Sequence, residues 1–171
     1  VIQELCHENP QKSEKAIENM AEFLKGNMTV LLSDKVVSFG DELNHTKKYL
    51  EMEYLRFEDQ LSVIYEINVD DFCLPALTLQ PIVENAVRYG VRKNEEGGTI
   101  RISTRENKVF YEVIVQDDGP GLNPDESNMG DGMHIGIKNV RERLIHICGG
   151  ELLLETEPGK GTCVTIRVRK D

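Results

Sequence analysis

The spacing of apolar residues predicts two amphipathic helices at the start of the chain. From Ser13 to about Asn27, apolar positions recur at close to helical intervals. A second helix is predicted to begin at Ser38, because Asp41 stands three residues further on and the pair forms an approximate capping box. The apolar stripe of this second helix contains Leu43, Leu50, Tyr54 and Phe57. Each helix therefore needs a partner that covers its apolar face.

From Leu61 the apolar period changes to two, which is typical of a half-buried strand over 61–67. The elements predicted next are a helix at about 77–91, strands at 99–104 and 109–116, a helix at 137–148, and strands at 151–155 and 162–169 joined by a turn at 158–161. This order predicts an α/β (α+β) two-layer sandwich with a mixed, mainly antiparallel sheet and its helices on one face. We expect two parts, amphipathic helices at 1–57 and the sandwich at 58–171.

Composition narrows the class of protein. The 171 residues suffice for one domain of ordinary size plus a helical appendage, and no signal peptide or membrane-length apolar run is present. The formal net charge of -10 argues against nonspecific binding to nucleic acid. The four cysteines form no C-x-x-C pair and have no metal-ligand spacing with histidine, which is typical of reduced cysteines in a cytosolic chain.

The predicted helix at 77–91 carries the first candidate site. On a helix, Asn85 shares a face with Pro81, Ile82 and Tyr89, and its carboxamide oxygen is a hard ligand that suits Mg²⁺. Arg88 and Tyr89 lie one turn further on, where a guanidinium can meet phosphate and a ring can pack on a base. The alternative for a lone asparagine is a helix cap or a surface amide.

The second candidate site follows the apolar strand at 109–115. There Asp117 and Asp118 precede Gly119-Pro120-Gly121. A tight turn explains the glycines, but a carboxylate left at the strand edge can also accept a hydrogen bond from an exocyclic amine such as that of adenine.

The third candidate site runs from Gly130 to Gly136 into the helix predicted at 137. Glycines permit close backbone approach, and the first turn of a helix offers free N–H groups to phosphate, whereas the alternative is a flexible connector. No P-loop is present, because 159–162 lacks its spacing, and no Rossmann fingerprint is found. Together the three parts predict a nucleotide pocket.

In order and spacing, these parts resemble the N box and the two glycine boxes of the GHKL ATPase superfamily. Within it, 77–86 (LTLQPIVENA), 136–144 (GIKNVRERL) and 49–57 (YLEMEYLRF) resemble the sensor histidine kinases of LytS/YesM type. The resemblance covers about 38–169. It implies the GHKL, or Bergerat, ATP-binding fold, with ATP and Mg²⁺ as ligands.

By the same resemblance, Asn85 would bind a Mg²⁺ that bridges the phosphates, and Asp117 would accept a hydrogen bond from the adenine amine. The glycines would shape the base pocket and a mobile lid, and Gly159 and Gly161 would close the adenine side. The nucleotide-binding residues implied in this way are Asn85, Arg88, Tyr89, Asp117, Gly119, Gly121, Gly132, Gly136 and Thr162.

Two positions depart from relatives in the superfamily. His134 stands where many carry the middle glycine of G-x-G-x-G, so the lid geometry departs from their pattern. Pro81 stands where the ATP-hydrolysing branches place a glutamate, and a proline cannot activate water. Glu84 points about 100° away from Asn85 on a helix. This combination favours a kinase over a hydrolase.

The phosphoryl-accepting histidine of this family lies in a segment that this sequence does not match. None of His7, His45, His134 and His146 has its context, and the chain begins in mid-pattern at Val1 without a cap. We therefore expect a truncated dimerisation and phosphotransfer region at 1–57, no catalytic residue in this chain, and nucleotide binding without autophosphorylation.

The resemblance implies the ATP-binding catalytic portion of a two-component sensor histidine kinase. The γ-phosphoryl group of ATP would pass to a histidine, leaving ADP, and then to an aspartate of a response regulator. The full-length protein would be a homodimer and an integral membrane sensor with this part in the cytoplasm, with no nucleic acid partner.

Three alternatives remain open. The first is a degenerate GHKL module that binds a partner protein without kinase turnover, which the histidine at 134 favours. The second is an ATP-hydrolysing machine of the gyrase or MutL kind, against which Pro81 argues. The third is a serine-directed anti-sigma kinase, which would lack the helix pattern at 49–57.

Overall fold

The computed structural model describes residues 36–57, 60–92, 97–121 and 131–170, together with isolated residues between 11 and 21. For 131–135 the backbone alone is described. The described residues of the helix predicted at 13–27 are helical, and the rest of that prediction lies outside the described part of the chain.

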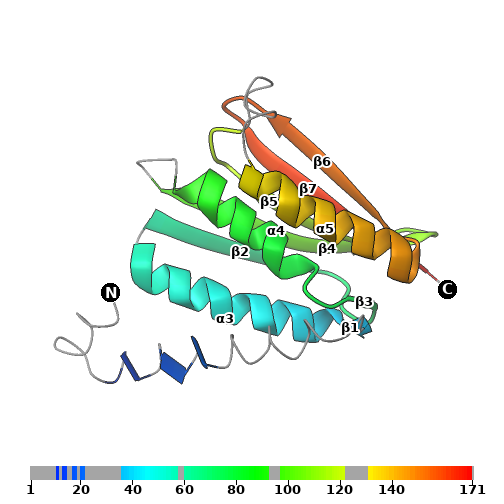
Figure 1. The fold of residues 1–171 in the computed structure, drawn as a ribbon, viewed down its shortest axis with the longest axis horizontal. Helices are drawn as coiled ribbons and strands as arrows, with labels where there is room; N and C mark the ends of the chain where they lie inside the picture. The colour runs from blue at the N-terminus through cyan, green and yellow to red at the C-terminus, as the bar shows by residue number, and fades with distance from the viewer. Residues whose placement is uncertain are drawn as a thin grey trace.

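A five-stranded sheet forms one layer of the sandwich (Figure 1). Its strand order is β2-β4-β5-β7-β6, in which β2 and β4 are parallel and the other neighbours are antiparallel. The strands are β2 (Leu61–Ile67), β4 (Gly98–Glu106), β5 (Phe110–Asp117), β6 (Glu151–Glu157) and β7 (Gly161–Arg169). The mixed, mainly antiparallel sheet expected from the hydrophobic pattern is confirmed.

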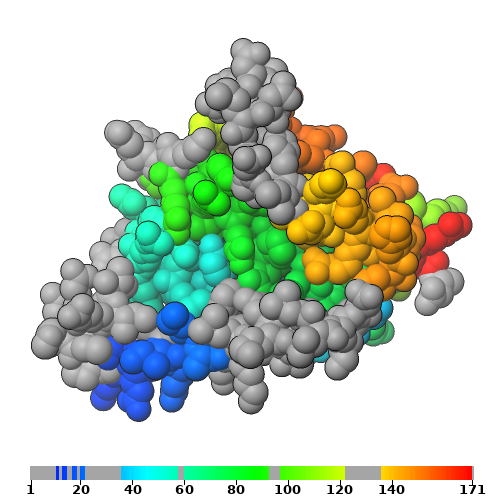
Figure 2. All heavy atoms as spheres, in the orientation of Figure 1, coloured from blue at the N-terminus to red at the C-terminus, as the bar shows by residue number. Residues whose placement is uncertain are grey.

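Helices form the second layer and lie along one face of this sheet (Figure 1). They are α3 (Phe39–Phe57), α4 (Leu79–Asn85), the π-helix η2 (Ala86–Val91) and α5 (Asp131–Cys148). In Figure 2 the surface of α4 and η2, drawn in green, lies between α3 in cyan and α5 in yellow and orange. The helices that carry the candidate site are thus flanked on both sides by helices.

Helix boundaries differ from the sequence prediction at two places. The helix expected over 77–91 begins at Leu79, and its second half is π-helical. The α5 helix begins at Asp131, so the prediction of a glycine loop up to Gly136 was wrong for 131–136. The buried face at Ile137, Val140 and Leu144 anchors the helix. Each residue added upstream forms a further hydrogen bond, which offsets the cost of about 1 kcal/mol for a helical glycine.

A second, two-stranded sheet was not predicted. The strand β1 (Val36–Ser38) pairs antiparallel with β3 (Cys73–Pro75). Three-residue strands are too short to show a period in the sequence. This pairing ties the start of α3 to the segment that leads into α4.

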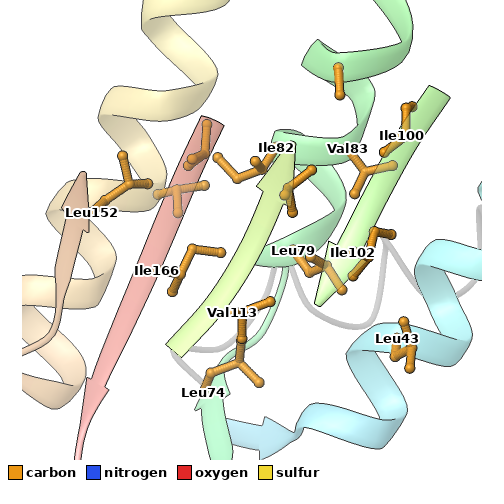
Figure 3. Close-up of a cluster of buried hydrophobic side chains, with 14 of the residues drawn as sticks. Leu43, Leu74, Leu79, Ile82, Val83, Ile100, Ile102, Val113, Leu152 and Ile166 are labelled. Carbon is orange, nitrogen blue, oxygen red and sulfur yellow. The ribbon is translucent and has the colours of Figure 1, made fainter. Parts of the chain in front are cut away.

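The hydrophobic core lies between the sheet and the helices (Figure 3). Branched aliphatic side chains of β4, β5 and β7 pack there against the inner face of α4, as close-packed interiors require. Side chains from the sheet are Ile100, Ile102, Val113 and Ile166, and those from α4 are Leu79, Ile82 and Val83.

The α3 helix contributes to the same core. Its Ser38 cap is confirmed, because the backbone N–H of Asp41 donates to Ser38 Oγ at 3.1 Å and Ser38 Oγ donates to the Asp41 carboxylate at 2.7 Å. Of the predicted stripe, Leu43 and Leu50 are buried, whereas Tyr54 is 52% exposed. The division of the chain at 57 and 58 remains a prediction.

Candidate nucleotide-binding site

One pocket contains side chains from all three candidate parts. It has a volume of about 300 Å³, open solvent included, and lies where α4 and η2 face the ends of β5 and β7 and one turn of α5. Its lining residues are Ile82, Asn85, Ala86, Tyr89, Val115, Asp117, Ile137, Thr162 and Val164. The structure therefore brings together Asn85, Tyr89, Asp117 and Thr162, which are separated by up to 77 positions in the sequence.

The buried acid of this pocket is Asp117, the last residue of β5. Its side chain is 6% exposed, and its carboxylate accepts the backbone N–H of Gly119 at 3.0 Å and that of Thr162. Burial, with a smaller contribution from the charge of Asp118, raises the pKa of Asp117 to about 6. A carboxylate with so little water around it is prepared to accept a further hydrogen bond from a ligand.

The neighbouring acid points elsewhere. Asp118 is exposed, and its carboxylate accepts the backbone N–H of Thr99 at 2.7 Å. The two acids follow each other in the chain, but their side chains point in different directions, because consecutive side chains of a strand alternate between its two faces. Asp118 therefore binds β4, whereas Asp117 is the acid of the pocket.

Three glycines enclose Asp117. A methyl group on Gly90 would lie 2.7 Å from the Asp117 Cγ, and one on Gly119 would overlap the Cα of Gly90. Gly161 has a φ of +83°, and a methyl group there would overlap the carbonyl oxygen of Asp117. The backbone thus approaches the acid so closely that only hydrogen fits at these positions.

Neither a role for Gly90 in the site nor the π-helix around it was predicted from the sequence. The π-helix places six residues, Ala86 to Val91, directly after Asn85 and delivers the backbone of Gly90 onto Asp117. Such π-helical turns occur often at functional sites. The available signal was a glycine inside an otherwise helical pattern, which costs about 1 kcal/mol relative to alanine.

Asn85 is the last residue of α4 and lines the pocket. Its Nδ2 atom is buried and makes no hydrogen bond with any of the described residues. A methyl group on Gly136 would stand 3.7 Å from this atom, so the first turns of α5 face the carboxamide. A buried amide without a partner is costly in a protein, and a ligand in the pocket can satisfy it.

The other predicted residues surround this centre. Arg88 is exposed and is not part of the lining, and its guanidinium stands over the ring of Tyr89 at 5.2 Å from the ring centroid. Gly121 has a φ of +68° and packs on the backbone of Glu157. Gly132 lies in the first turn of α5, whose side chains are outside the described part of the chain.

The turn at 158–160 closes one side of the site. The backbone N–H of Gly159 donates to the carbonyl of Pro120 at 2.7 Å, and the hydroxyls of Thr156 and Thr162 lie 3.3 Å apart. These contacts join the turn between β6 and β7 to the glycine segment after β5. The glycines at 119, 121, 159 and 161 are thereby gathered at one end of the sheet, next to the pocket.

Neither a metal centre of protein side chains nor a membrane span is found in the described part of the chain. The described residues contain no cluster of three or more histidine, cysteine or acidic side chains arranged to hold a metal ion. No helix among them combines the length and apolar character needed to cross a lipid bilayer.

Solved structures of histidine kinase catalytic domains share the fold of this chain. The catalytic domain of histidine kinase ThkA superposes with a TM-score of 0.62 over 80% of this chain and 95% of that one, at 16% identity. Histidine kinase AdeS of Acinetobacter baumannii gives a TM-score of 0.61 over 97% of this chain and 84% of that one, at 15% identity. The fold is therefore that of the catalytic domain of histidine kinases.

Family models agree with the fold. A model described as histidine kinase-, DNA gyrase B-, and HSP90-like ATPase matches residues 75–171, and one described as histidine kinase matches residues 1–61. The chain belongs to the histidine kinase-, DNA gyrase B- and HSP90-like ATPase family, and it carries this ATPase domain in its histidine kinase form. The resemblance to LytS/YesM-type kinases and the GHKL fold expected from the sequence are confirmed.

Relatives resemble most of this chain. The chain is 34% identical to the uncharacterised protein YwpD of Bacillus subtilis over 170 residues. The aligned region covers 96% of this chain and 61% of YwpD. Identity is 34% to sensor histidine kinase YpdA of Escherichia coli, over 88% of this chain and 28% of YpdA. It is 31% to sensor histidine kinase YesM of Bacillus subtilis, over 96% of this chain and 29% of YesM. The chain thus spans less than a third of the two sensor kinases.

Proposed function

We propose that this chain binds ATP in the pocket between α4, η2 and the ends of β5 and β7, and that it is the catalytic ATP-binding portion of a two-component sensor histidine kinase. The observation that carries the proposal is the presence of two buried polar groups in one pocket. They are the carboxylate of Asp117 and the Nδ2 of Asn85, which has no partner among the described residues.

The adenine end of the nucleotide would lie at Asp117. Its carboxylate would accept the exocyclic amine, and Gly119, Gly121 and Thr162 would hold the base through close backbone approach. The ring of Tyr89, which lines the pocket, would offer an apolar face to the nucleotide, and Arg88 beside it, outside the lining, would offer a charge to the phosphates.

The phosphate end would lie towards Asn85 and α5. Asn85 would place its amide oxygen on Mg²⁺, because the assignment of oxygen and nitrogen in a carboxamide follows its partners and is free to reverse. Bound there, Mg²⁺ supplies positive charge that neutralises the phosphates during transfer. Gly132 and Gly136 would bring the α5 backbone close to the same phosphates.

The reaction would be transfer to a histidine, not hydrolysis. Pro81, four residues before Asn85, cannot serve as a base for water. None of the four histidines has the acceptor context, so we place the acceptor outside this sequence. The phosphoryl group would pass from it to a response-regulator aspartate. We infer that the full-length protein is a homodimeric membrane sensor that has this part in the cytoplasm.

The test is calorimetric titration of the chain with a non-hydrolysable ATP analogue and Mg²⁺, beside Asn85→Ala and Asp117→Asn. Asp118→Asn is the matched control, because it removes the same charge from the neighbouring residue that binds β4. We expect saturable binding by the parent and the control, and about tenfold or greater weakening in the two pocket variants. A folded parent that does not bind would favour the degenerate, partner-binding module.

A further inference from the structure

The start of α4 has no cap from its own sequence. Thr78 stands at the N-cap, but its side chain makes no capping hydrogen bond, and its hydroxyl donates instead to the carbonyl of Pro75. The preceding residue, Leu77, has a φ of +56°, a conformation that leucine rarely adopts. The first N–H groups of a helix need acceptors, so an acceptor must come from elsewhere.

Glu42 of α3 supplies that acceptor. It is 4% exposed, and its carboxylate accepts the backbone N–H groups of Leu77 at 2.6 Å, Thr78 at 3.0 Å and Leu79 at 3.0 Å. Burial raises the pKa of Glu42 above its ordinary value, and the three N–H donors oppose that shift. A carboxylate is favourable at this place because the N-terminus of a helix carries partial positive charge.

Contacts from α3 and α5 complete the attachment. Beyond the end of η2, Arg92 pairs with Glu53 of α3 at 3.2 Å, and its guanidinium stands 5.2 Å from the ring centroid of Phe57. From α5, Arg143 donates to the carbonyl of Leu77 at 2.7 Å. The α3 helix therefore holds the α4–η2 stretch at both of its ends, and α5 holds the strained turn before it.

The close contact of Gly90 with Asp117 makes the pocket sensitive to the position of this stretch. Asn85 lies six residues after Leu79 on one helix, about 9 Å along its axis. Gly90 lies against Asp117, where even a methyl group would come within 2.7 Å of the carboxylate carbon. A displacement of the start of α4 would therefore move Asn85. It would also push Gly90 against Asp117 or draw Gly90 away from it.

We propose that Glu42 is a positioning residue for the nucleotide pocket, through which α3 sets where α4 begins and so sets the distance from Asn85 to Asp117. The inference rests on the proposed nucleotide binding. It gives α3, which lies within the histidine kinase match at 1–61, a direct effect on nucleotide affinity in the ATPase match at 75–171.

Glu42→Gln tests this role, because it keeps the shape of the side chain and replaces one acceptor oxygen by a donor that faces backbone N–H groups. The matched control is Glu112→Gln. Glu112 is likewise buried, at 3% exposed, but it pairs with Arg105 at 2.5 Å and Arg167 at 2.8 Å on the face of the sheet opposite Val113. Glu42→Asp, which keeps the charge but shortens the reach, serves if the glutamine variant does not fold.

Calorimetric titration with the ATP analogue and Mg²⁺ is paired with hydrogen exchange over residues 79–91. We expect Glu42→Gln to bind the analogue about tenfold more weakly, with faster exchange over 79–91, at a temperature where all variants are folded. The control, Glu112→Gln, is expected to keep both the affinity and the exchange of the parent, whatever stability it loses.

The outcomes separate the inference from the proposed function. A folded parent that fails to bind would overturn nucleotide binding and the role of Glu42 with it. Parental affinity in the Glu42 variant would overturn the positioning role alone. Equal weakening in Glu42→Gln and Glu112→Gln would also overturn it, because the effect would then be a general loss of stability.

Discussion

Asp117→Asn is expected to make the ligand-free chain more stable at neutral pH while it weakens nucleotide binding. The parent keeps a carboxylate 6% exposed in the pocket, with a pKa raised from 3.8 to about 6 by burial and by the charge of Asp118. The folded state therefore holds this group in its ionised form at an energetic disadvantage. Asparagine has nearly the same shape and carries no charge.

The size of the effect follows from the pKa. A displacement from 3.8 to about 6 corresponds to about 3 kcal/mol against the folded state well above pH 6. Asparagine keeps one acceptor oxygen for the N–H groups of Gly119 and Thr162, so we subtract about 1 kcal/mol for the poorer hydrogen bonding. The net gain is about 2 kcal/mol at pH 8, or about 4–8 °C in Tm for a chain of this size.

The sign of the pH dependence is determined by the raised pKa. Between pH 3.8 and about 6 the folded chain binds more protons at this site than the unfolded chain. This contribution to the stability of the parent therefore falls as pH rises through that window, and it is constant above it. About half of the 3 kcal/mol, roughly 1.5 kcal/mol, develops between pH 5 and pH 8.

The assay is thermal unfolding followed by far-ultraviolet circular dichroism at pH 5, 6, 7 and 8, because the chain has no tryptophan for fluorescence. Asp118→Asn is measured beside it and is expected to show a smaller change. A difference in Tm between Asp117→Asn and the parent that is the same at pH 5 and pH 8 would refute the reasoning. So would unchanged nucleotide affinity in this variant.

Two shorter predictions concern the backbone. Gly90→Ala should destabilise the chain by about 1–3 kcal/mol and weaken nucleotide binding, because its methyl group meets Asp117 at 2.7 Å. Gly40→Ala, with its nearest atom 3.8 Å away in Ser38, should leave binding intact, and calorimetry with thermal unfolding separates the two. Leu77→Ile should destabilise the chain more than Leu77→Asn in urea unfolding, since a φ of +56° disfavours β-branched residues and suits asparagine. The reverse order would show that side-chain burial outweighs backbone strain.

The hydrophobic pattern by itself determines most of the helices and strands. Periods of two and of 3.6 are local properties of the chain, so the strands at Leu61–Ile67 and Phe110–Asp117 and the α3 helix were predicted within a few residues. The chemistry at element ends is also local. A carboxylate at the end of an apolar strand and an asparagine on one face of a predicted helix are visible in the sequence, and these are Asp117 and Asn85.

Tertiary structure decided which groups surround Asp117 and Asn85. The pairing of Asn85 and Asp117 in one pocket, and the choice of Asp117 over Asp118, depend on how β4, β5 and β7 register with each other. The helical start of α5 at Asp131 and the π-helix at Ala86–Val91 depend on packing that overrides local propensity.

The cap on α4 shows the same division most clearly. Nothing near Thr78 in the sequence indicates which residue accepts hydrogen bonds from the start of α4. Glu42, which accepts three of them from backbone N–H groups, lies 35 to 37 positions earlier in the chain. Buried polar groups must be satisfied, but the sequence does not say by which residue. Local periodicity determined most of the helices and strands of this protein, and contacts between distant segments determined the positions of Asn85, Gly90 and Asp117 that define its site.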